Sequence, residues 1–243
     1  SYRGLDHNIH TAEGFTNYTI FSLWDTYRAE HPFLNLLKPR QNRDMVQSMI
    51  RHQQQSVHGM LPVWSLMGNE GWCMSGYHAV SVLADAITKG VFSNVDEALS
   101  AMVSTSTVPY YEGVADYMKL GYIPLDKSGT AASSTLEYAY DDWCISIFAE
   151  AMSDFETKAK YERFAKAYEF YFDKSTRFMR GLDSNGEWCT PFNPRASTHR
   201  SDDYCEGTAW QWTWFVPHDI EGLVKLMGGE DAFVGKLDSL FTA

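Results

Sequence analysis

The chain has 243 residues, of which 44% are hydrophobic and 21% charged, so it is long enough and apolar enough to fold around a sizeable core. Its 20 basic and 31 acidic residues give a net charge of −11 without a basic stripe, which argues against a nucleic-acid partner. No apolar stretch approaches the roughly 20 residues that a membrane-spanning helix needs, so no membrane span is expected.

Apolar residues recur at helical spacing through most of the chain. Residues 39–58 are expected to form an amphipathic helix with Pro39 in its first turn; the apolar stripe of this helix consists of Met45, Val46, Met49 and Ile50. Residues 77–89 are apolar on nearly every face, and Gly90 is placed to end the helix that they predict. A helix with that pattern should be buried.

The middle of the chain predicts a buried helix followed by a solvent-facing one. Ser93 with Asp96 begins a first helix, and Ser134 with Glu137 has the spacing of a capping box before an almost wholly apolar helix over residues 136–152. Residues 155–172 are charged along one side. An inner helix and an outer helix that covers it are the arrangement this pattern favours.

The C-terminal part predicts two more helices. The first begins at Pro217 and ends at Gly228 and Gly229. The second has an apolar face made of Phe233, Val234, Leu237, Leu240 and Phe241. No convincing strand alternation competes, so the fold class is mainly α, either a helical toroid, a bundle or a solenoid. Since no Pro- or Ser-rich linker divides the chain, a single domain over residues 1–243 is expected.

Two long segments, residues 61–78 and 187–219, concentrate aromatic and polar residues instead of periodic apolar ones. The second segment holds four of the chain's 8 tryptophans, namely Trp188, Trp210, Trp212 and Trp214. A Trp ring can stack on the C–H face of a sugar while neighbouring polar side chains bind its hydroxyls. The alternative for residues 210, 212 and 214 is ordinary core packing.

Several polar residues in and near these segments are candidates for chemistry. Glu206, flanked by Tyr204, Gly207 and Trp210, sits where partial desolvation would favour the protonated carboxyl that a general acid needs; the alternative is an ordinary surface glutamate. Asp25 can hold a ligand hydroxyl or form an ion pair with Arg28.

Four further residues have equally plain alternatives. Asn69 and Glu70 either line a pocket or form a turn with Gly68 and Gly71. His78 and His218 fit hydrogen-bonded structural histidines better than metal ligands. The spacing of His, Cys, Asp and Glu defines no metal site in this sequence, so the metal ligands stay unknown.

The segments that carry these candidates resemble glycoside hydrolase family 92, whose members are exo-acting, calcium-dependent α-mannosidases. The resemblance rests on GFTNY at 14–18, FSLWDTYR at 21–28, LPVW at 61–64, GNE at 68–70, GYHAV at 76–80, YCEG at 204–207 and WQWTWFVPHD at 210–219. These motifs occur in the family's order along essentially the whole chain. The resemblance implies an (α/α)6 helical barrel and hydrolysis of terminal α-mannosidic bonds, α-1,2-mannosidase-like, in mannosides or N-glycans, with inversion.

The resemblance also implies roles for individual residues. Glu206 matches the general acid, and Asp25 matches an aspartate that holds the mannose ring. The remaining matched positions are weaker candidates to line the same pocket; they are Trp24, Asn69, Glu70, His78 and Trp210. Calcium is implied as a cofactor and mannose-containing glycans as partners. Because the family is common in bacteria that export such enzymes, a periplasmic or extracellular location is implied as well.

The sequence departs from the family pattern in two places. Neither the downstream Gly-Asn-Glu-Pro-Ser-His-His motif nor the Gly-Asn-Asp/Glu-Asp-Cys-Gly motif with the base occurs in these residues. The β-sandwich domain with which family members begin is expected to be absent from them as well. We therefore expect a fragment of the catalytic barrel that needs the remainder of its own polypeptide and is inactive alone, with the base beyond the chain end. The alternatives are a non-catalytic mannose-binding helical domain and another (α/α)6 glycosidase.

Overall fold

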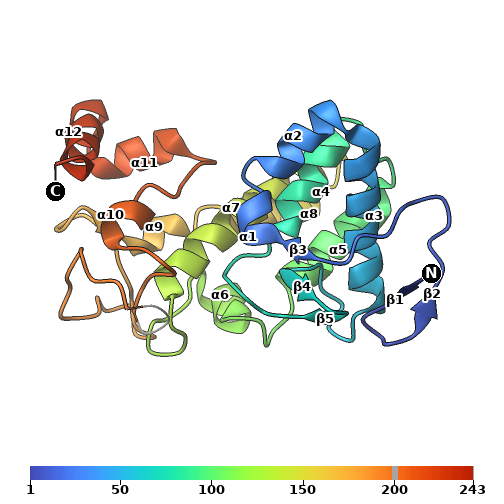
Figure 1. Cartoon of the computed structure of the whole chain (residues 1–243). Helices are drawn as coiled ribbons and strands as arrows, with labels where there is room; N and C mark the ends of the chain where they lie inside the picture. The colour runs from blue at the N-terminus through green and yellow to red at the C-terminus, as the bar shows by residue number, and fades with distance from the viewer. Residues whose placement is uncertain (199–201, 243) are drawn as a thin grey trace. The chain divides into compact units, whose positions relative to one another are not determined.

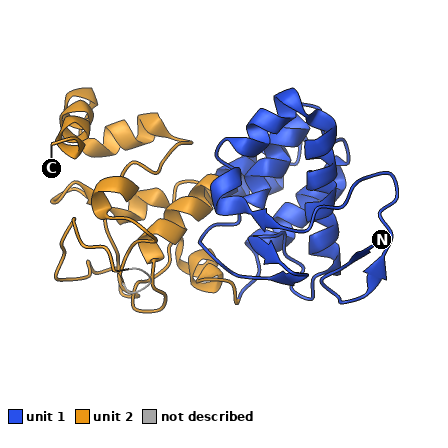
Figure 2. Ribbon diagram, viewed as in Figure 1, with its two compact units in different colours: residues 1–109, 141–162 blue, residues 110–140, 163–243 orange. Residues whose placement is uncertain are grey.

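The protein is described by a computed structural model that covers residues 1–198 and 202–242. Helices dominate these residues and strands are few and short (Figure 1), which confirms the mainly-α class. No helix among them is both long and apolar enough to cross a bilayer. The chain forms two compact units, residues 1–109 with 141–162 and residues 110–140 with 163–243 (Figure 2). The toroid and the single domain over 1–243 stay predictions.

Unit 1 combines small sheets with a helical core. Strand β1 (Tyr2–Arg3) pairs with β2 (Ile9–His10), and β3 (Phe21–Ser22), β4 (Trp64–Leu66) and β5 (Asn69–Glu70) form an antiparallel sheet in that order. Phe21 is opposite Ser65, and Ser65 is opposite Glu70. The helices are α1 (Leu23–Thr26), α2 (Glu30–Leu37), α3 (Pro39–Gln55), α4 (Ala79–Thr88), α5 (Val95–Ser106) and most of α8 (Phe155–Phe164).

The core of unit 1 lies where α2, α3, α4 and α5 pack together. Val46, Met49 and Ile50 of α3 are fully buried, as the apolar stripe predicts, whereas Met45 is only half-buried. Helix α4 is buried on most faces, which confirms the prediction for residues 77–89. It begins at Ala79, two residues later than predicted. The Tyr77 amide and the His78 ring both donate to the Asp141 carboxylate instead.

Unit 2 is built around tyrosines. Its helices are α6 (Val114–Leu120), the first half of α7 (Ala131–Ala151), α9 (Tyr168–Tyr171), α10 (Ala209–Trp212), α11 (Ile220–Met227) and α12 (Glu230–Leu240); β6 (Phe172–Asp173) pairs with β7 (Phe178–Met179). Helix α6 begins after Gly113 and ends before Gly121, both left-handed. The fully buried tyrosine side chains of this unit are Tyr111, Tyr117, Tyr138, Tyr168 and Tyr171.

Three predicted helix boundaries need correction. Helix α7 begins at Ala131, so Ser134 and Glu137 lie inside it and the predicted capping box is wrong. Residues 155–172 do not form one helix, because α8 ends at Phe164 and a short α9 precedes strand β6. Helix α11 begins at Ile220 instead of Pro217, since the Asp219 carboxylate accepts the Gly222 amide as an N-cap, and Gly228 ends it as predicted.

A buried chain of polar side chains joins three helices of unit 1. The His31 Nδ1 donates to Asn42 Oδ1 at 2.7 Å, the Asn42 amide donates to Asn35 at 2.6 Å, and the Asn35 amide donates to Asp85 at 2.7 Å. Asn42 is fully buried and uses both ends of its amide in this chain. Burial lowers the pKa of His31, so the ring is held as a neutral donor.

Replacing the central residue, Asn42→Ala, is expected to lower the free energy of unfolding by about 2 kcal/mol or more, because each buried polar group left without a partner costs about 1–3 kcal/mol. Urea unfolding measures this. Gln41→Ala, at an exposed position of the same helix, is the control and should change stability by less than about 0.5 kcal/mol. Equal losses in the two variants would contradict a structural role for the network.

Candidate active site

Glu206 stands in a loop of unit 2 whose main chain is held on both sides. The Cys205 amide donates to Ser133 Oγ at 2.9 Å, and the Trp212 indole N–H donates to the Cys205 carbonyl at 2.9 Å. On the other side, the Thr208 amide donates to Gln211 Oε1 at 3.0 Å, within the capping box of α10. Glu206 therefore lies between Cys205 and Thr208, whose main chains are fixed by these hydrogen bonds.

The backbone of Glu206 is left-handed, with φ of 42°. A side chain with a Cβ pays about 1–2 kcal/mol for this conformation, and residues held in it cluster at functional sites. The conformation persists because the hydrogen bonds of the flanking residues fix the chain direction. Its effect is to direct the carboxylate outward, and the Glu206 side chain is exposed while Cys205 and Gly207 are buried.

The desolvation of Glu206 that its sequence neighbours predict is therefore not found. The Tyr204 hydroxyl donates to the Met179 carbonyl at 2.6 Å. Trp210 packs edge-on against Phe178, with ring centroids 4.8 Å apart. Tyr204 and Phe178 belong to the core of unit 2, and the half-buried Trp210 packs on it, which is the packing alternative for the tryptophans. Trp214, also half-buried, packs on Phe233. A role for Trp210 in lining the pocket stays a prediction.

Asp203 is a further candidate carboxyl group of this loop, and the sequence analysis does not identify it. Its side chain is buried, with 8% of the residue exposed. Burial raises the pKa of its carboxyl, and the neighbouring Asp202 adds to the rise while Arg180 opposes it. The signal was the acidic pair Asp202-Asp203 directly before Tyr204-Cys205-Glu206, but its burial depends on Gly181, where a Cβ would collide with the Asp203 carboxylate.

In unit 1, Trp24 and Asp25 lie in α1, which follows β3 directly. Asp25 is exposed, and its carboxylate accepts a hydrogen bond from the Ser22 hydroxyl. The Arg28 guanidinium lies over Trp24, 5.0 Å from the ring centroid, and its Nε donates to the Trp24 carbonyl at 3.0 Å. Trp24 and Asp25 are therefore adjacent groups, one aromatic and one acidic, on a short helix held by the β3-β4-β5 sheet.

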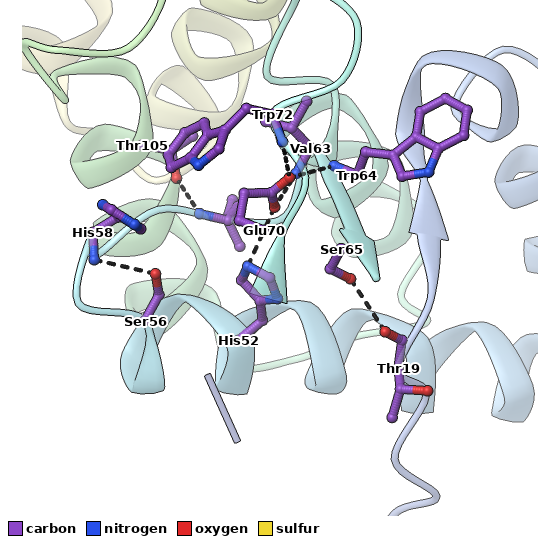
Figure 3. A network of polar contacts seen from close by, with 11 residues as sticks. Thr19, His52, Ser56, His58, Val63, Trp64, Ser65, Glu70, Trp72 and Thr105 are labelled. Atoms are coloured by element: carbon purple, nitrogen blue, oxygen red, sulfur yellow. Dashed lines mark hydrogen bonds and ion pairs between the residues drawn. The ribbon is translucent and has the colours of Figure 1, made fainter. Parts of the chain in front are cut away.

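Glu70 lies in the same sheet, but its carboxylate points into the protein (Figure 3). One oxygen accepts the amides of Trp64 and Trp72 at 2.8 and 3.1 Å, and the other accepts the Val63 amide at 3.0 Å and lies 3.5 Å from His52 Nε2. Burial alone would raise the pKa of Glu70, but the bonds from His52, Val63 and Trp64 outweigh it and hold the pKa below its ordinary value. Glu70 organises the loop around β4.

Asn69 flanks a tight turn, which is the alternative to pocket lining that the sequence allowed. Leu66 and Asn69 are paired across β4 and β5, and Met67 and Gly68 between them have φ of 54° and 75°. Two left-handed residues in a two-residue loop form a type I′ hairpin turn. The Asn69 side chain is exposed and its amide is 3.4 Å from the Met67 carbonyl. Its role in sugar binding stays a prediction.

His78 is a buried, hydrogen-bonded histidine, as expected. Its Nδ1 donates to Asp141 at 2.9 Å, and its ring stacks on Tyr27 with centroids 3.9 Å apart. Asp141 also accepts the Tyr77 amide at 2.9 Å. His218 is structural too, because its Nε2 donates to the Ala165 carbonyl at 2.8 Å and burial lowers its pKa.

The structure therefore groups the candidates by unit. Unit 1 holds Trp24, Asp25, Asn69, Glu70 and His78, and unit 2 holds Glu206 and Trp210. Over residues 1–198 and 202–242, no three His, Cys, Asp or Glu side chains gather so that they could hold a metal ion. Calcium, which the family implies, stays a prediction without assigned ligands.

Comparison with known proteins identifies the relatives of this chain. The glycosyl hydrolase family 92 catalytic domain matches residues 1–243. The structure superposes on the family GH92 α-mannosidase BT3965 of Bacteroides thetaiotaomicron with a TM-score of 0.95 and 47% identity, covering all of this chain and 32% of that one. It superposes on the family GH92 inverting mannosidase BT2199 of the same species with a TM-score of 0.89 and 36% identity, covering 97% of this chain and 32% of that one.

A fungal relative is an uncharacterized secreted glycosidase of Arthroderma benhamiae, 29% identical over 218 residues, which cover 75% of this chain and 28% of the fungal protein. The chain thus spans about a third of the length of the relatives it matches.

Glu70→Gln is expected to lower the free energy of unfolding at pH 7 by about 1–3 kcal/mol, because an amide cannot accept all the bonds that the carboxylate accepts. A lowered folded-state pKa means that the ionised group contributes stability above its ordinary value of 4.5, and that this stability is lost as pH falls through the lower folded value. The variant should therefore show a flatter stability curve below pH 4.5. Urea unfolding across this range, with Glu13→Gln as an exposed control, tests it; parallel curves would contradict it.

Because the backbone of Glu206 is left-handed, glycine is expected to be a more stable replacement than alanine there, the reverse of the order in a helix. Glu206→Gly should be more stable than Glu206→Ala by about 1 kcal/mol, because only glycine adopts this conformation without a Cβ penalty. At Glu169, within α9, alanine should instead be the more stable replacement. Thermal unfolding of the four variants compares the positions, and the same order at both would rule out strain at Glu206.

Proposed function

This chain belongs to glycosyl hydrolase family 92, and on that premise we propose that it is part of the catalytic domain of an inverting exo-α-mannosidase with Glu206 as the general acid. The observation that carries the proposal is the presentation of Glu206: an exposed carboxylate on a left-handed residue between anchored neighbours. The names of the two Bacteroides relatives, an α-mannosidase and an inverting mannosidase, support the substrate and the stereochemistry.

The reaction divides between two carboxyl groups. Glu206 gives its proton to the glycosidic oxygen as the bond from that oxygen to the anomeric carbon breaks. A water molecule attacks the same carbon from the opposite face, and a carboxylate base takes the proton that the water loses. The products are β-mannose and the leaving alcohol. In inverting enzymes the two carboxyl groups lie roughly 6.5–9.5 Å apart to leave room for the water.

We place the base outside these 243 residues. The support is that the chain lacks the downstream motifs of the family and spans about a third of the length of the solved relatives. The (α/α)6 toroid is proposed on the same ground, as an arrangement that the longer protein completes. The chain by itself is then expected to be inactive, and its partner is the remainder of the polypeptide.

Asp25 and Trp24 are the groups best placed in unit 1 to hold a mannose ring, because an exposed carboxylate accepts sugar hydroxyls and an indole face packs against sugar C–H groups. Asn69, also exposed, is a second polar candidate. Glu70 and His78 support the loop and the helix beside these groups, since their own polar atoms bind within the protein. The secreted fungal relative supports an extracellular location.

Glu206→Gln in the full-length enzyme is expected to lower kcat for an unactivated α-mannoside by about 10²–10⁴-fold, since the variant cannot donate the proton. Glu169→Gln, an exposed glutamate of the same unit, is the matched control and should act like the wild type. The assay is release of the terminal monosaccharide, mannose from α-mannosides and glucose from α-glucosides.

Retained activity in the Gln variant would overturn the assignment of the acid. Cleavage of glucosides but not mannosides would favour another glycosidase of this architecture. Mannose binding by calorimetry without turnover in the full-length protein would favour a non-catalytic binding domain.

A further inference from the structure

We propose that Ser133, in the first turn of α7, is a positioning residue that sets the conformation of Glu206. This inference rests on the proposed role of Glu206 as the general acid and adds a residue to that site. Ser133 is 72 residues distant from Cys205 in the sequence, and none of the family motifs quoted above includes it.

The first turn of every α-helix has amide groups without partners inside the helix. In α7 the loop before Glu206 supplies the acceptors. The Ala132 and Ser133 amides both donate to the Asp203 carbonyl at 3.1 Å, and just before the helix the Thr130 amide donates to the Asp202 carbonyl at 2.8 Å. The start of α7 and the loop that leads to Glu206 therefore form one hydrogen-bonded assembly.

The Ser133 side chain extends this assembly to the residue next to Glu206. Its hydroxyl donates to the Thr130 carbonyl at 2.9 Å and accepts the Cys205 amide at 2.9 Å. Ser133 is fully buried. Because its one proton goes to Thr130, its oxygen is oriented to accept from Cys205. Loss of this hydroxyl removes the acceptor of a buried amide, which costs about 1–3 kcal/mol and favours a shift of the loop.

The next peptide, between Cys205 and Glu206, is held by Trp212. Its indole N–H donates to the Cys205 carbonyl, and this approach depends on Gly207, where a Cβ would lie 2.7 Å from the indole nitrogen. The carbonyl of Cys205 and the amide of Glu206 belong to one peptide plane, whose orientation about the N–Cα bond of Glu206 is the φ angle. Trp212 therefore fixes the peptide plane that defines the φ of Glu206, and Ser133 fixes the preceding Tyr204–Cys205 peptide, so that together they hold the chain that leads into Glu206.

The chemical consequence follows from the strain. If the Ser133 contact is lost, Glu206 can relax toward a negative φ, and its carboxyl group leaves the direction in which it meets the glycosidic oxygen. A misplacement of about 1 Å can reduce a rate by about 10²-fold. This loss should affect only reactions in which the leaving group needs a proton from Glu206.

The test compares two α-mannosides in the full-length enzyme. A mannose disaccharide has an alcohol leaving group that needs protonation, whereas a dinitrophenyl α-mannoside has a leaving group that departs as the anion. Ser133→Ala is expected to lower kcat for the disaccharide by about 10- to 100-fold and to leave kcat for the dinitrophenyl substrate near the wild-type value. The ratio of the two rates does not depend on the fraction of folded enzyme.

Ser134→Ala is the matched control. Ser134 is equally buried in the same turn, but its hydroxyl meets Thr130 Oγ1 at 3.3 Å instead of the loop. It should leave the ratio unchanged. Equal loss on both substrates in Ser133→Ala, no loss at all, or the same selective loss in Ser134→Ala would overturn the positioning role.

Glu206→Gln in the same assay separates the two proposals. If kcat for the disaccharide falls selectively in Glu206→Gln but not in Ser133→Ala, only the Ser133 inference fails. If Glu206→Gln shows no selective loss, or if the wild type cleaves no α-mannoside, the assignment of the acid fails and the positioning role fails with it.

Discussion

The hydrogen bonds between the first turn of α7 and the loop before Glu206 are the interaction on which the candidate site depends. They satisfy the amides that begin α7 and at the same time fix the main chain of residues 202–205. Without them, α7 would begin with unpaired buried amides, and no interaction would offset the cost of the left-handed backbone at Glu206. One set of bonds thus stabilises the longest helix and presents the carboxylate proposed to donate the proton.

Unit 1 uses buried polar groups in a comparable way. The Glu70 carboxylate accepts hydrogen bonds from amides of its own hairpin and of the following loop. The Asp141 carboxylate accepts hydrogen bonds from the Tyr77 amide and the His78 ring at the start of α4. These contacts divide the motif residues into two kinds. The side chains of Asp25 and Asn69 are exposed, whereas Glu70 and His78 bind groups within unit 1.

The sequence predicted the helices better than their ends. The apolar stripes of α3 and α4 and the glycine that ends α11 are local signals, and the structure has them where they were expected. The start of α7 was missed because its acceptors come from Asp202 and Asp203, which are distant in the sequence. A capping box at Ser134 was a sound local pattern, but a tertiary contact replaced it.

The environment of the candidate site residues was not predictable from the sequence, and their roles stay predictions. The roles of Glu206 and Asp25 came from the family motifs, since position alone favoured ordinary surface residues. The aromatic neighbours of Glu206 suggested desolvation, yet the left-handed backbone directs its side chain to solvent, and Tyr204 and Trp210 pack elsewhere. Asp203 was missed because its burial depends on the close approach of Gly181, which no local pattern reveals.

The most direct measurement is proton NMR of the anomer first released when the full-length enzyme cleaves an α-mannoside, recorded for the wild type and for Glu206→Gln. β-Mannose should appear first with the wild type and should not accumulate with the variant, because inversion with Glu206 as the acid requires both results. α-Mannose as the first product, or undiminished release by the variant, would contradict an inverting mannosidase that uses Glu206 as its acid.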